Sequence, residues 1–430
     1  MARKMKDSGI EWIGEIPEGW ETINPKALFT QRKDRASKGE RQLTSSQQYG
    51  ILYQDEYMEL TGSKVVTVEK DFDILKHVEA GDFVISMRSF QGGLEYSTNS
   101  GAISSAYVML VPNLELVYPR FYRWLLKSSV YIDALQRTTN MVRDGQAMRY
   151  SNFAQVRLFT LPLDEQKSRA DFLDLECSSI DKILFKTRSS IEEHKKLKQA
   201  VITQAVTKGV RGEREMKDSG VEWAGLVPHH WGVAKIGSIG QTSSGATPLR
   251  SKEASFFDDA TIRWVRTLDL NDGLVYDSSE KITELALASS ACSIMPKGTV
   301  CVAMYGGAGT IGKCGLLMSD CATNQAVCSI VCNREIVSPI FLLMQLLALK
   351  SYWMKYAVGT RKDPNISQDI VARMKILIPP LDEQKEITDH LDAKCAEIDG
   401  LIAKKEQLVK ELESYKKSLI YEVVTGKREV

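Results

Sequence analysis

An internal repeat constrains the fold of this chain more than any other feature. Residues 5–12 read Met-Lys-Asp-Ser-Gly-Ile-Glu-Trp, and residues 216–223 read the same except for valine in place of isoleucine. A second block, Leu-Asp-Glu-Gln-Lys at residues 163–167, returns at residues 381–385. The stretches between the blocks share little sequence. The repeat therefore predicts two halves built alike around two dissimilar inserts.

Each Leu-Asp-Glu-Gln-Lys block is expected to open a long helix. Asp164 can cap the first helix, and no glycine or proline interrupts residues 163–208. Apolar or small residues then recur at alternating steps of four and three, which is a heptad seam. Such a rod cannot bury its seam alone, so we expect the helices to pair as an antiparallel coiled coil with approximate two-fold symmetry. The seam residues include Ile180, Leu184, Ile191 and Val201 in the first helix and Ile398, Ile402, Val409, Leu412 and Leu419 in the second.

The inserts favour an α+β fold. Runs rich in β-branched and apolar residues, bounded by Gly, Ser and Asp, predict strands at residues 64–68, 82–87, 106–111, 261–265 and 299–305. Helices that start with a proline are expected at residues 119–135 and 339–356. The predicted organisation is two α+β domains and two helical regions, in the order 1–161 (domain), 162–212 (helix), 213–379 (domain) and 380–430 (helix).

Composition excludes several classes of protein. The 430 residues carry 56 Lys and Arg against 55 Asp and Glu, so a histone-like polybasic chain is excluded and any nucleic-acid contact must use local patches. The longest apolar run, residues 340–349, is far shorter than the roughly 20 residues that span a bilayer. No apolar segment follows the basic N-terminus, as a secretion signal would require. We therefore expect a cytoplasmic protein without membrane contact.

The cysteines could indicate a metal site and a glycine-rich segment could indicate a nucleotide-binding loop, but the neighbouring sequence argues against both interpretations. Most of the cysteines lie between Cys292 and Cys332 without any Cys-x-x-Cys pair, so we expect buried thiols and no metal site. Residues 307–314 fit a dinucleotide fingerprint and nearly fit a phosphate-binding loop. Cys314, however, stands where such a loop needs Ser or Thr, and Gly315 follows where a helix should begin. A glycine-rich turn or a loop facing DNA is the favoured reading.

Catalytic motifs are absent from the sequence. We find no His-Glu-x-x-His, no Gly-x-Ser-x-Gly and no Asn/Asp-Pro-Pro-Tyr of an amino-methyltransferase, and the histidines are scattered. The expectation is that this chain binds no cofactor or metal and carries no active site. A self-contained DNA enzyme would need one of these motifs, and a purely structural coiled-coil adaptor would leave the inserts without a role.

The order of insert, helix, insert and helix resembles the specificity (S) subunit of type I restriction-modification systems over essentially the whole chain. Besides the repeated blocks, the resemblance rests on short motifs in the second half: Ser-Gly-Ala-Thr-Pro at 244–248, Trp264 with Asp269, Gly312-Lys313, Asn-Gln-Ala at 324–326 and Ile-Pro-Pro-Leu-Asp-Glu-Gln at 378–384. The first insert lacks the Gly-x-Thr-Pro element. The domains are therefore expected to belong to different sequence groups and to recognise different DNA half-sites.

The resemblance implies a non-catalytic reader of double-stranded DNA. Each insert would be a target-recognition domain for one half of a bipartite, asymmetric sequence, and the long helices would set the distance between the halves. It also implies partners: two methylation (M) subunits and two restriction (R) subunits, which would carry S-adenosylmethionine, ATP and Mg. The repeat fits this reading, because a bipartite site needs two readers at a fixed separation.

Candidate DNA-contacting residues lie in polar or turn-like segments. Arg suits guanine, Gln and Asn suit adenine, and Lys suits phosphate. A solvated surface charge is the alternative for each. In the first domain the candidates are Arg32, Lys33, Arg35, Lys38, Arg41, Arg88, Ser89, Gln91, Arg143 and Arg149. In the second domain they are Thr247, Arg250, Lys252, Tyr305, Lys313, Arg361 and Lys362.

Overall fold

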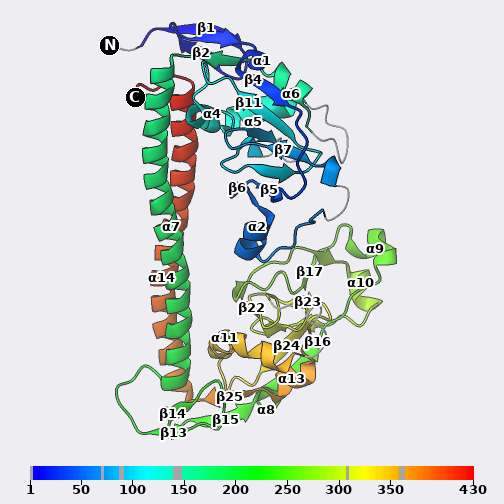
Figure 1. Cartoon of the computed structure of the whole chain (residues 1–430). Helices are drawn as coiled ribbons and strands as arrows, with labels where there is room; N and C mark the ends of the chain where they lie inside the picture. Colours follow the sequence, from blue (N-terminus) through cyan, green and yellow to red (C-terminus); the bar gives the residue numbers. More distant parts are fainter. Residues whose placement is uncertain (1–2, 69–71, 87–91, 139–147, 307–308, 358–363) are drawn as a thin grey trace. The chain divides into compact units, whose positions relative to one another are not determined.

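The computed structural model of the chain divides into two compact units (Figure 1). It describes residues 3–68, 72–86, 92–138, 148–306, 309–357 and 364–430, without the side chains of residues 252 and 253. Unit 1 comprises Met1–Arg188 with Gln407–Val430, and unit 2 comprises Ser189–Glu406. The long helices α7 (Leu163–Lys208) and α14 (Leu381–Val424) each contribute one segment to both units.

Unit 1 contains an antiparallel sheet of strand order β4-β11-β8-β9 and a set of short hairpins. Its core is aromatic, with Phe29, Phe83, Phe121 and Tyr122 fully buried. The strands are β1 Met5–Ile10, β2 Gly14–Pro17, β3 Glu21–Ile23, β4 Phe29–Arg32, β5 Leu43–Ser46, β6 Gly50–Tyr53, β7 Lys76–Val78, β8 Phe83–Ile85, β9 Glu95–Tyr96, β10 Gly101–Ile103, β11 Val108–Pro112 and β12 Leu158–Thr160. The shorter helices are α1 Pro25–Leu28, α2 Gln54–Thr61, α4 Pro119–Leu125, α5 Ser129–Arg137, α6 Tyr150–Gln155 and the 3₁₀ turn η1 Phe72–Ile74.

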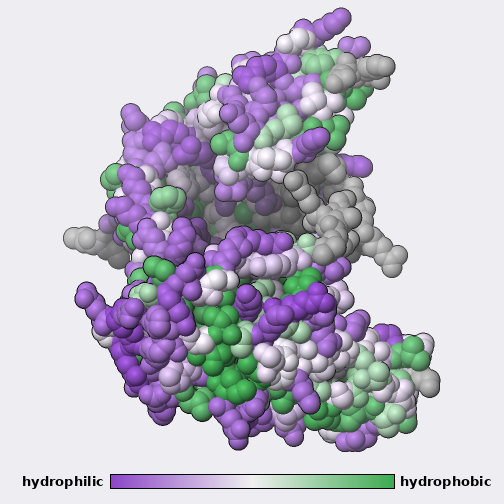
Figure 2. Space-filling model, turned by 90° about the horizontal axis from the view of Figure 1, so that it is seen from below, coloured by the Kyte–Doolittle hydropathy of each residue, from purple (hydrophilic) through white to green (hydrophobic). Residues whose placement is uncertain are grey.

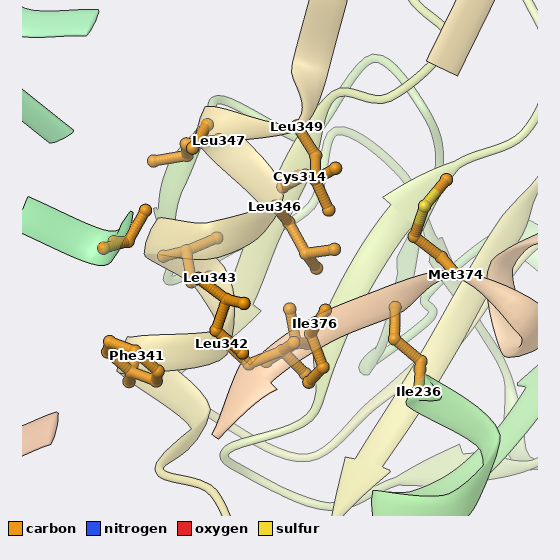
Figure 3. Packing of buried hydrophobic residues seen from close by; sticks show 14 of the residues in the cluster. Ile236, Cys314, Phe341, Leu342, Leu343, Leu346, Leu347, Leu349, Met374 and Ile376 are labelled. Carbon is orange, nitrogen blue, oxygen red and sulfur yellow. The ribbon is translucent and has the colours of Figure 1, made fainter. Parts of the chain in front are cut away.

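Unit 2 contains two mixed sheets, of order β16-β24-β21-β22-β18 and β19-β17-β23-β20. Its main core lies under α11, where Phe341, Leu342 and Leu346 pack among Ile376 and Cys314 (Figure 3). The strands are β13 Met216–Asp218, β14 Leu226–Pro228, β15 Gly232–Lys235, β16 Gly240–Ser244, β17 Ile262–Val265, β18 Gly273–Val275, β19 Lys281–Ile282, β20 Ile294–Met295, β21 Val300–Ala303, β22 Cys314–Leu317, β23 Cys321–Thr323, β24 Val327–Cys332 and β25 Lys375–Ile378. The shorter helices are α8 Ile236–Ile239, η2 Arg250–Lys252, α9 Glu253–Phe257, α10 Glu284–Ala288, α11 Pro339–Ala348, η3 Lys350–Tyr352, α12 Trp353–Tyr356 and α13 Gln368–Arg373.

The long helices run antiparallel, as the heptad pattern predicts. In unit 1 Asp181 pairs with Lys416, and Arg188, seven residues further along α7, pairs with Glu413, which precedes Lys416 on α14. In unit 2 Lys198 of α7 pairs with Asp399 of α14. Of the predicted seam residues, Ile180, Leu184, Ile191, Ile398 and Leu419 are buried, and Val201, Ile402, Val409 and Leu412 are half-buried.

Several local predictions need correction. The segment 64–68 is not a strand: the Gln42 side chain bonds both the amide and the carbonyl of Val68, and so replaces a strand ladder there. The expected helix 119–135 breaks before Ser128, whose hydroxyl caps α5. The expected helix 339–356 is interrupted after α11 by η3. Helix α7 begins at Leu163, so Asp164 lies in its first turn and does not cap it.

Two other predictions are confirmed: a helix does not follow the glycine-rich segment, and the cysteines are free and mostly buried. Strand β22 begins at Cys314, so a strand follows Gly312-Lys313 where a phosphate-binding loop would need a helix. All of the cysteines are free thiols, and all but the half-buried Cys332 are buried. Burial raises the pKa of the Cys332 thiol to about 11, which keeps it protonated and unreactive at neutral pH.

The surface is mostly hydrophilic on the face shown in Figure 2, with hydrophobic side chains gathered in a smaller band. Among the residues that the structure describes, no helix is long and apolar enough to cross a membrane.

Candidate nucleic-acid interface

Each Leu-Asp-Glu-Gln-Lys block contacts a tryptophan that lies eight residues after the other repeated block, once in each unit. In unit 1 the fully buried Trp20 donates its indole N–H to Glu165 Oε2 at 3.1 Å. In unit 2 the fully buried Trp231 donates to Glu383 Oε2, also at 3.1 Å. We call each pair a Trp–Glu clamp. Each clamp fixes the start of one long helix to the hairpin that opens the adjoining domain.

The glutamine that follows each clamp glutamate holds a shorter helix of the same unit against the long helix. Gln166 accepts the Tyr118 amide at 2.7 Å and donates to the Leu116 and Leu161 carbonyls, each at 2.8 Å. Tyr118 directly precedes α4, so the buried amide side chain holds that helix against α7. Gln384 does the same in unit 2, where it accepts the Ser338 amide at 2.8 Å, directly before α11. The repeated Leu-Asp-Glu-Gln motif is therefore structural.

The charges around the two clamps differ. Glu165 pairs with Arg3 and with Arg169, a fully buried arginine on the next turn of α7. Burial favours the neutral acid, but the hydrogen bonds from Arg3, Arg169 and Trp20 hold the pKa of Glu165 at about 2. Glu383 has no buried arginine on its own helix, and its partners come from the loop after α7 and from the β14–β15 connection. They are Arg211, Arg214 and His230.

A polar surface forms in unit 2 where two parallel strands end. β17 and β23 pair in parallel, so the turns after Val265 and Thr323 leave the same edge of the sheet. The Asn324 amide donates to the Val265 carbonyl at 3.0 Å and joins these turns. The third segment is residues 244–248, where a Cβ on Gly245 would lie 1.9 Å from the Thr323 carbonyl oxygen, so glycine is required. We call residues 244–250, 266–269 and 323–326 the three-loop surface.

Two arginines of the three-loop surface lie around a buried tryptophan. Trp264 donates its indole N–H to the Ala246 carbonyl at 3.1 Å, which ties β17 to the third segment. Arg250 and Arg266 both bind Glu280, at 2.6 Å each, and Arg250 also lies 5.6 Å from the Trp264 ring centroid. Two guanidinium groups thus share one carboxylate, and Asp269 lies in the same turn as Arg266, so the positive and negative charges balance. The surface can offer guanidinium hydrogen-bond donors to a phosphate backbone, but no net positive charge.

Comparisons with known proteins agree with a chain of two α+β domains attached to two long helices. The family model for the "Type I restriction modification DNA specificity domain" matches residues 228–411. The putative type I restriction enzyme MjaX specificity subunit of Methanocaldococcus jannaschii is 21% identical and covers 96% of this chain and 95% of its own length. The MjaVIII specificity subunit of the same organism is 23% identical over 81% of this chain and 80% of its own. The chain is therefore similar to type I restriction enzyme specificity subunits, over nearly its whole length in the case of MjaX.

A solved structure has the same fold. It is described as "Structural basis underlying complex assembly and conformational transition of the type I R-M system" and aligns with a TM-score of 0.72 at 14% identity. The alignment covers 96% of this chain and 99% of that one. It matches the expected fold of two α+β domains and paired long helices.

In unit 2, the structure brings several of the candidate DNA-contacting residues together. Thr247 is exposed, and its hydroxyl donates to Gln325. Arg250 is exposed beside it, and Tyr305 is half-exposed next to Met304, whose amide binds the Ala326 carbonyl at 2.8 Å. Lys313 is half-buried at the start of β22. The backbone of Lys252 ends η2, while Arg361 and Lys362 lie outside the described residues.

In the first recognition domain, some predicted contacts are already engaged within the fold. Arg32 holds the buried Asp82 through two hydrogen bonds, of 2.6 and 3.1 Å, so it serves folding. Arg41 binds Asp55 and Glu56 and lies 3.5 Å from the Tyr53 ring centroid. Arg35 donates to the Ile74 carbonyl at 3.0 Å.

Other candidates of the first recognition domain point into solvent. Lys33 and Lys38 are exposed on the segment after β4, and Arg149 is exposed just before α6. They are therefore available to a ligand such as DNA. The remaining candidates of this domain, Arg88, Ser89, Gln91 and Arg143, lie outside the described residues.

A histidine clamp lies beside the exposed lysines. His77 Nδ1 contacts Glu40 at 2.8 Å, and its Nε2 contacts Glu79 at 3.0 Å. Burial lowers the pKa of His77, but its hydrogen bonds to Glu79 and Glu40 outweigh burial and leave the pKa raised. The clamp joins β7 to the segment that carries Lys38.

The sequence analysis missed Arg266 and Glu280 as parts of the three-loop surface. Their contact joins residues distant along the chain and leaves no periodic signal in the sequence. Arg266 could have been found from its position between Trp264 and Asp269, because Asp269 accepts the Arg266 amide at 2.7 Å and closes a turn.

Proposed function

We propose that this chain reads a bipartite, asymmetric DNA sequence, with one recognition domain for each half and the long helices as the spacer. The observation that carries the proposal is the repeated Trp–Glu clamp. It fastens two dissimilar domains to equivalent starts of α7 and α14. An asymmetric bipartite site requires two different recognition domains that are held in equivalent positions, and the two clamps would hold them in this way.

The dissimilarity of the readers supports different half-sites. The second recognition domain presents the three-loop surface, built on Gly245 and Trp264. The first has no Gly-x-Thr-Pro element, and its exposed cations lie after β4 instead. Different loops on the two domains would place different side chains in the DNA grooves.

We further propose that the chain scaffolds two methylation and two restriction subunits and performs no catalysis itself. S-adenosylmethionine, ATP and Mg would be bound by those partners. Support comes from the described titratable groups, which serve the fold: His77 joins two glutamates, and Glu165 and Glu383 hold tryptophans. The partners follow from the family, and the solved structure of similar fold is described by the complex assembly of a type I system.

The test uses the full chain with and without a methylation subunit. Purified alone with S-adenosylmethionine and a long random duplex pool, the chain should transfer no methyl groups. With the methylation subunit it should methylate adenines within one bipartite sequence, seen by sequencing of methylated bases. Methyl transfer by the chain alone would show that it is an enzyme. Failure of the complex to shift or methylate any duplex would show an adaptor that does not read DNA.

A further inference from the structure

A solvent-exposed leucine stands at the tip of the turn after β17. Leu268 is 74% exposed, whereas Leu270, two residues later, is 1% exposed and belongs to the core. The neighbouring loops of the three-loop surface are mostly polar, with Arg250 and Gln325 exposed, and they carry one other exposed leucine, Leu249. At 74% exposure, the Leu268 side chain contributes little buried area to the fold.

The turn that carries Leu268 is held rigidly. Asp269 Oδ2 accepts the Arg266 amide at 2.7 Å, and the Asp269 amide donates back to the Arg266 carbonyl at 3.0 Å. Asp269 Oδ1 accepts the Ser279 amide at 2.9 Å, and the Arg266 guanidinium binds Ser279 and Glu280. A side chain presented by such a closed turn is pre-organised, so little conformational entropy is lost when it meets a ligand.

The surroundings of Leu268 indicate which DNA groove would receive it. Its turn is joined to the turn at Asn324 by the hydrogen bond to Val265, and residues 244–248 lie against Thr323. Leu268 is presented together with two further loops, and of the two grooves the major groove, about 12 Å wide against about 6 Å for the minor groove, is the one that admits an element of protein backbone with its side chains. The apolar group that the major groove offers is the C5-methyl of thymine.

We propose that Leu268 contacts the C5-methyl group of a thymine in the half-site read by the second recognition domain. The proposal rests on the proposed function and adds one specificity-determining residue to it. Arg250 and Arg266 would meet the backbone phosphates beside that base pair. Leu268 would then discriminate thymine from the other bases by packing.

The experiment compares thymine with deoxyuridine, which lacks only the C5-methyl group. Duplexes contain the methylated site of the full complex, with each thymine of the second half-site replaced in turn. Binding by the complex is measured for the unsubstituted chain, for Leu268→Ala and for Leu285→Ala, a control leucine that is also exposed in unit 2. Thermal unfolding checks that neither variant is destabilised.

At one thymine position, deoxyuridine should weaken binding of the unsubstituted chain about fourfold, the effect of one lost methyl contact. Leu268→Ala should weaken binding to the thymine duplex by a similar factor and lose nothing further with deoxyuridine, whereas Leu285→Ala should behave like the unsubstituted chain. The inference is wrong if deoxyuridine weakens binding at no position. It is also wrong if Leu268→Ala and deoxyuridine together weaken binding by the product of their separate factors, because the two changes would then act independently. In either case, specific binding by the unsubstituted chain leaves the proposed function intact. If the unsubstituted chain binds no duplex, both fall.

Discussion

The two Trp–Glu clamps share a geometry, while the surfaces beyond them differ. Trp20 and Trp231 are both fully buried and hold their glutamates at the same 3.1 Å, and Gln166 and Gln384 make matching bonds. The recognition surfaces share no such residues. In this chain, repeated sequence therefore marks the attachment of the domains, and divergent sequence marks the surfaces that we propose to read DNA.

The largest expected effect comes from removing either clamp tryptophan. Trp20→Ala and Trp231→Ala should each destabilise their own unit by about 3–5 kcal/mol, because each leaves a large cavity and removes the indole donor of a glutamate. Hydrogen exchange read by mass spectrometry should show the loss of protection in unit 1 for Trp20→Ala and in unit 2 for Trp231→Ala. Equal loss in both units from one substitution would contradict independent clamps.

Replacing the glutamate of each clamp by glutamine should destabilise the two units to different extents, because the charged partners of the two glutamates differ. Glu165→Gln leaves the fully buried Arg169 without its carboxylate and should cost about 3–5 kcal/mol. Glu383→Gln should cost less, about 1–2 kcal/mol, because Arg211 and His230 are partly exposed and water can solvate them. Denaturant unfolding of the two variants, followed by fluorescence, measures the difference. A larger loss from Glu383→Gln would overturn this ranking.

The Glu165 clamp also has a defined pH window. Its pKa is about 2 in the folded chain and near 4.5 ordinarily, so its stabilising effect is present above pH 4.5 and is lost as pH falls toward 2. Glu165→Gln should remove that part of the acid sensitivity of unit 1.

The exposed lysines of the first recognition domain should affect DNA binding without affecting stability. The double substitution Lys33→Ala and Lys38→Ala should weaken binding and reduce the slope of log affinity against log salt by up to about 2, one for each lost phosphate contact. Gel shifts over a salt series give the slope. An unchanged slope would remove these lysines from the interface.

Arg32→Ala, next to Lys33 in the sequence, should have the opposite effect to the lysine substitutions, on stability instead of DNA binding. It leaves the buried Asp82 without its arginine, so it should lower the thermal stability of unit 1. A stability as high as that of the unsubstituted chain would contradict the structural role assigned to Arg32.

The smallest effect concerns the histidine clamp of unit 1. The pKa of His77 is raised, so its stabilisation is fully present below its ordinary value of 6.5 and is lost as pH rises through the folded pKa. The partners are partly exposed, so the effect should stay below about 1 kcal/mol. His77→Gln should abolish the change in unit 1 stability between pH 6 and 8. Persistence of that change in the variant would assign it to another group.

The sequence predicted the parts of the fold that leave a periodic or repeated signal. The heptads of α7 and α14 and the paired blocks around Trp20 and Trp231 could be read directly. The breaks at Ser128 and at η3 could not, because a hydroxyl cap and a 3₁₀ turn interrupt otherwise helical sequence. Segment 64–68 was wrongly read as a strand because its bonding partner, Gln42, is distant along the chain.

The recognition surfaces were less predictable than the helices. Turn residues around Thr247 and Arg250 mark them as candidates, and their contact with DNA stays a prediction. Arg266, Glu280 and Leu268 were missed, since their roles depend on the parallel pairing of β17 with β23. Arg32 looked like a DNA contact by composition, but its guanidinium is held by a carboxylate fifty residues along the chain.

The central claim is that the long helices set the distance between two half-sites. Inserting seven residues after Ser190 and seven after Leu408 keeps both heptad seams in phase. The insertion points fall between the ion pairs Arg188–Glu413 of unit 1 and Lys198–Asp399 of unit 2. Each helix then grows by about 10 Å, at 1.5 Å per residue, which corresponds to roughly three base pairs of B-form DNA.

The decisive measurement is a methylome of cells that carry the insertion variant with its methylation subunit. The same two half-site sequences should be methylated with a spacer about three base pairs longer, and more slowly, because the half-sites are also rotated by roughly 100° about the DNA axis. An unchanged spacer, or altered half-sites at the original spacing, would contradict the claim that α7 and α14 set the distance.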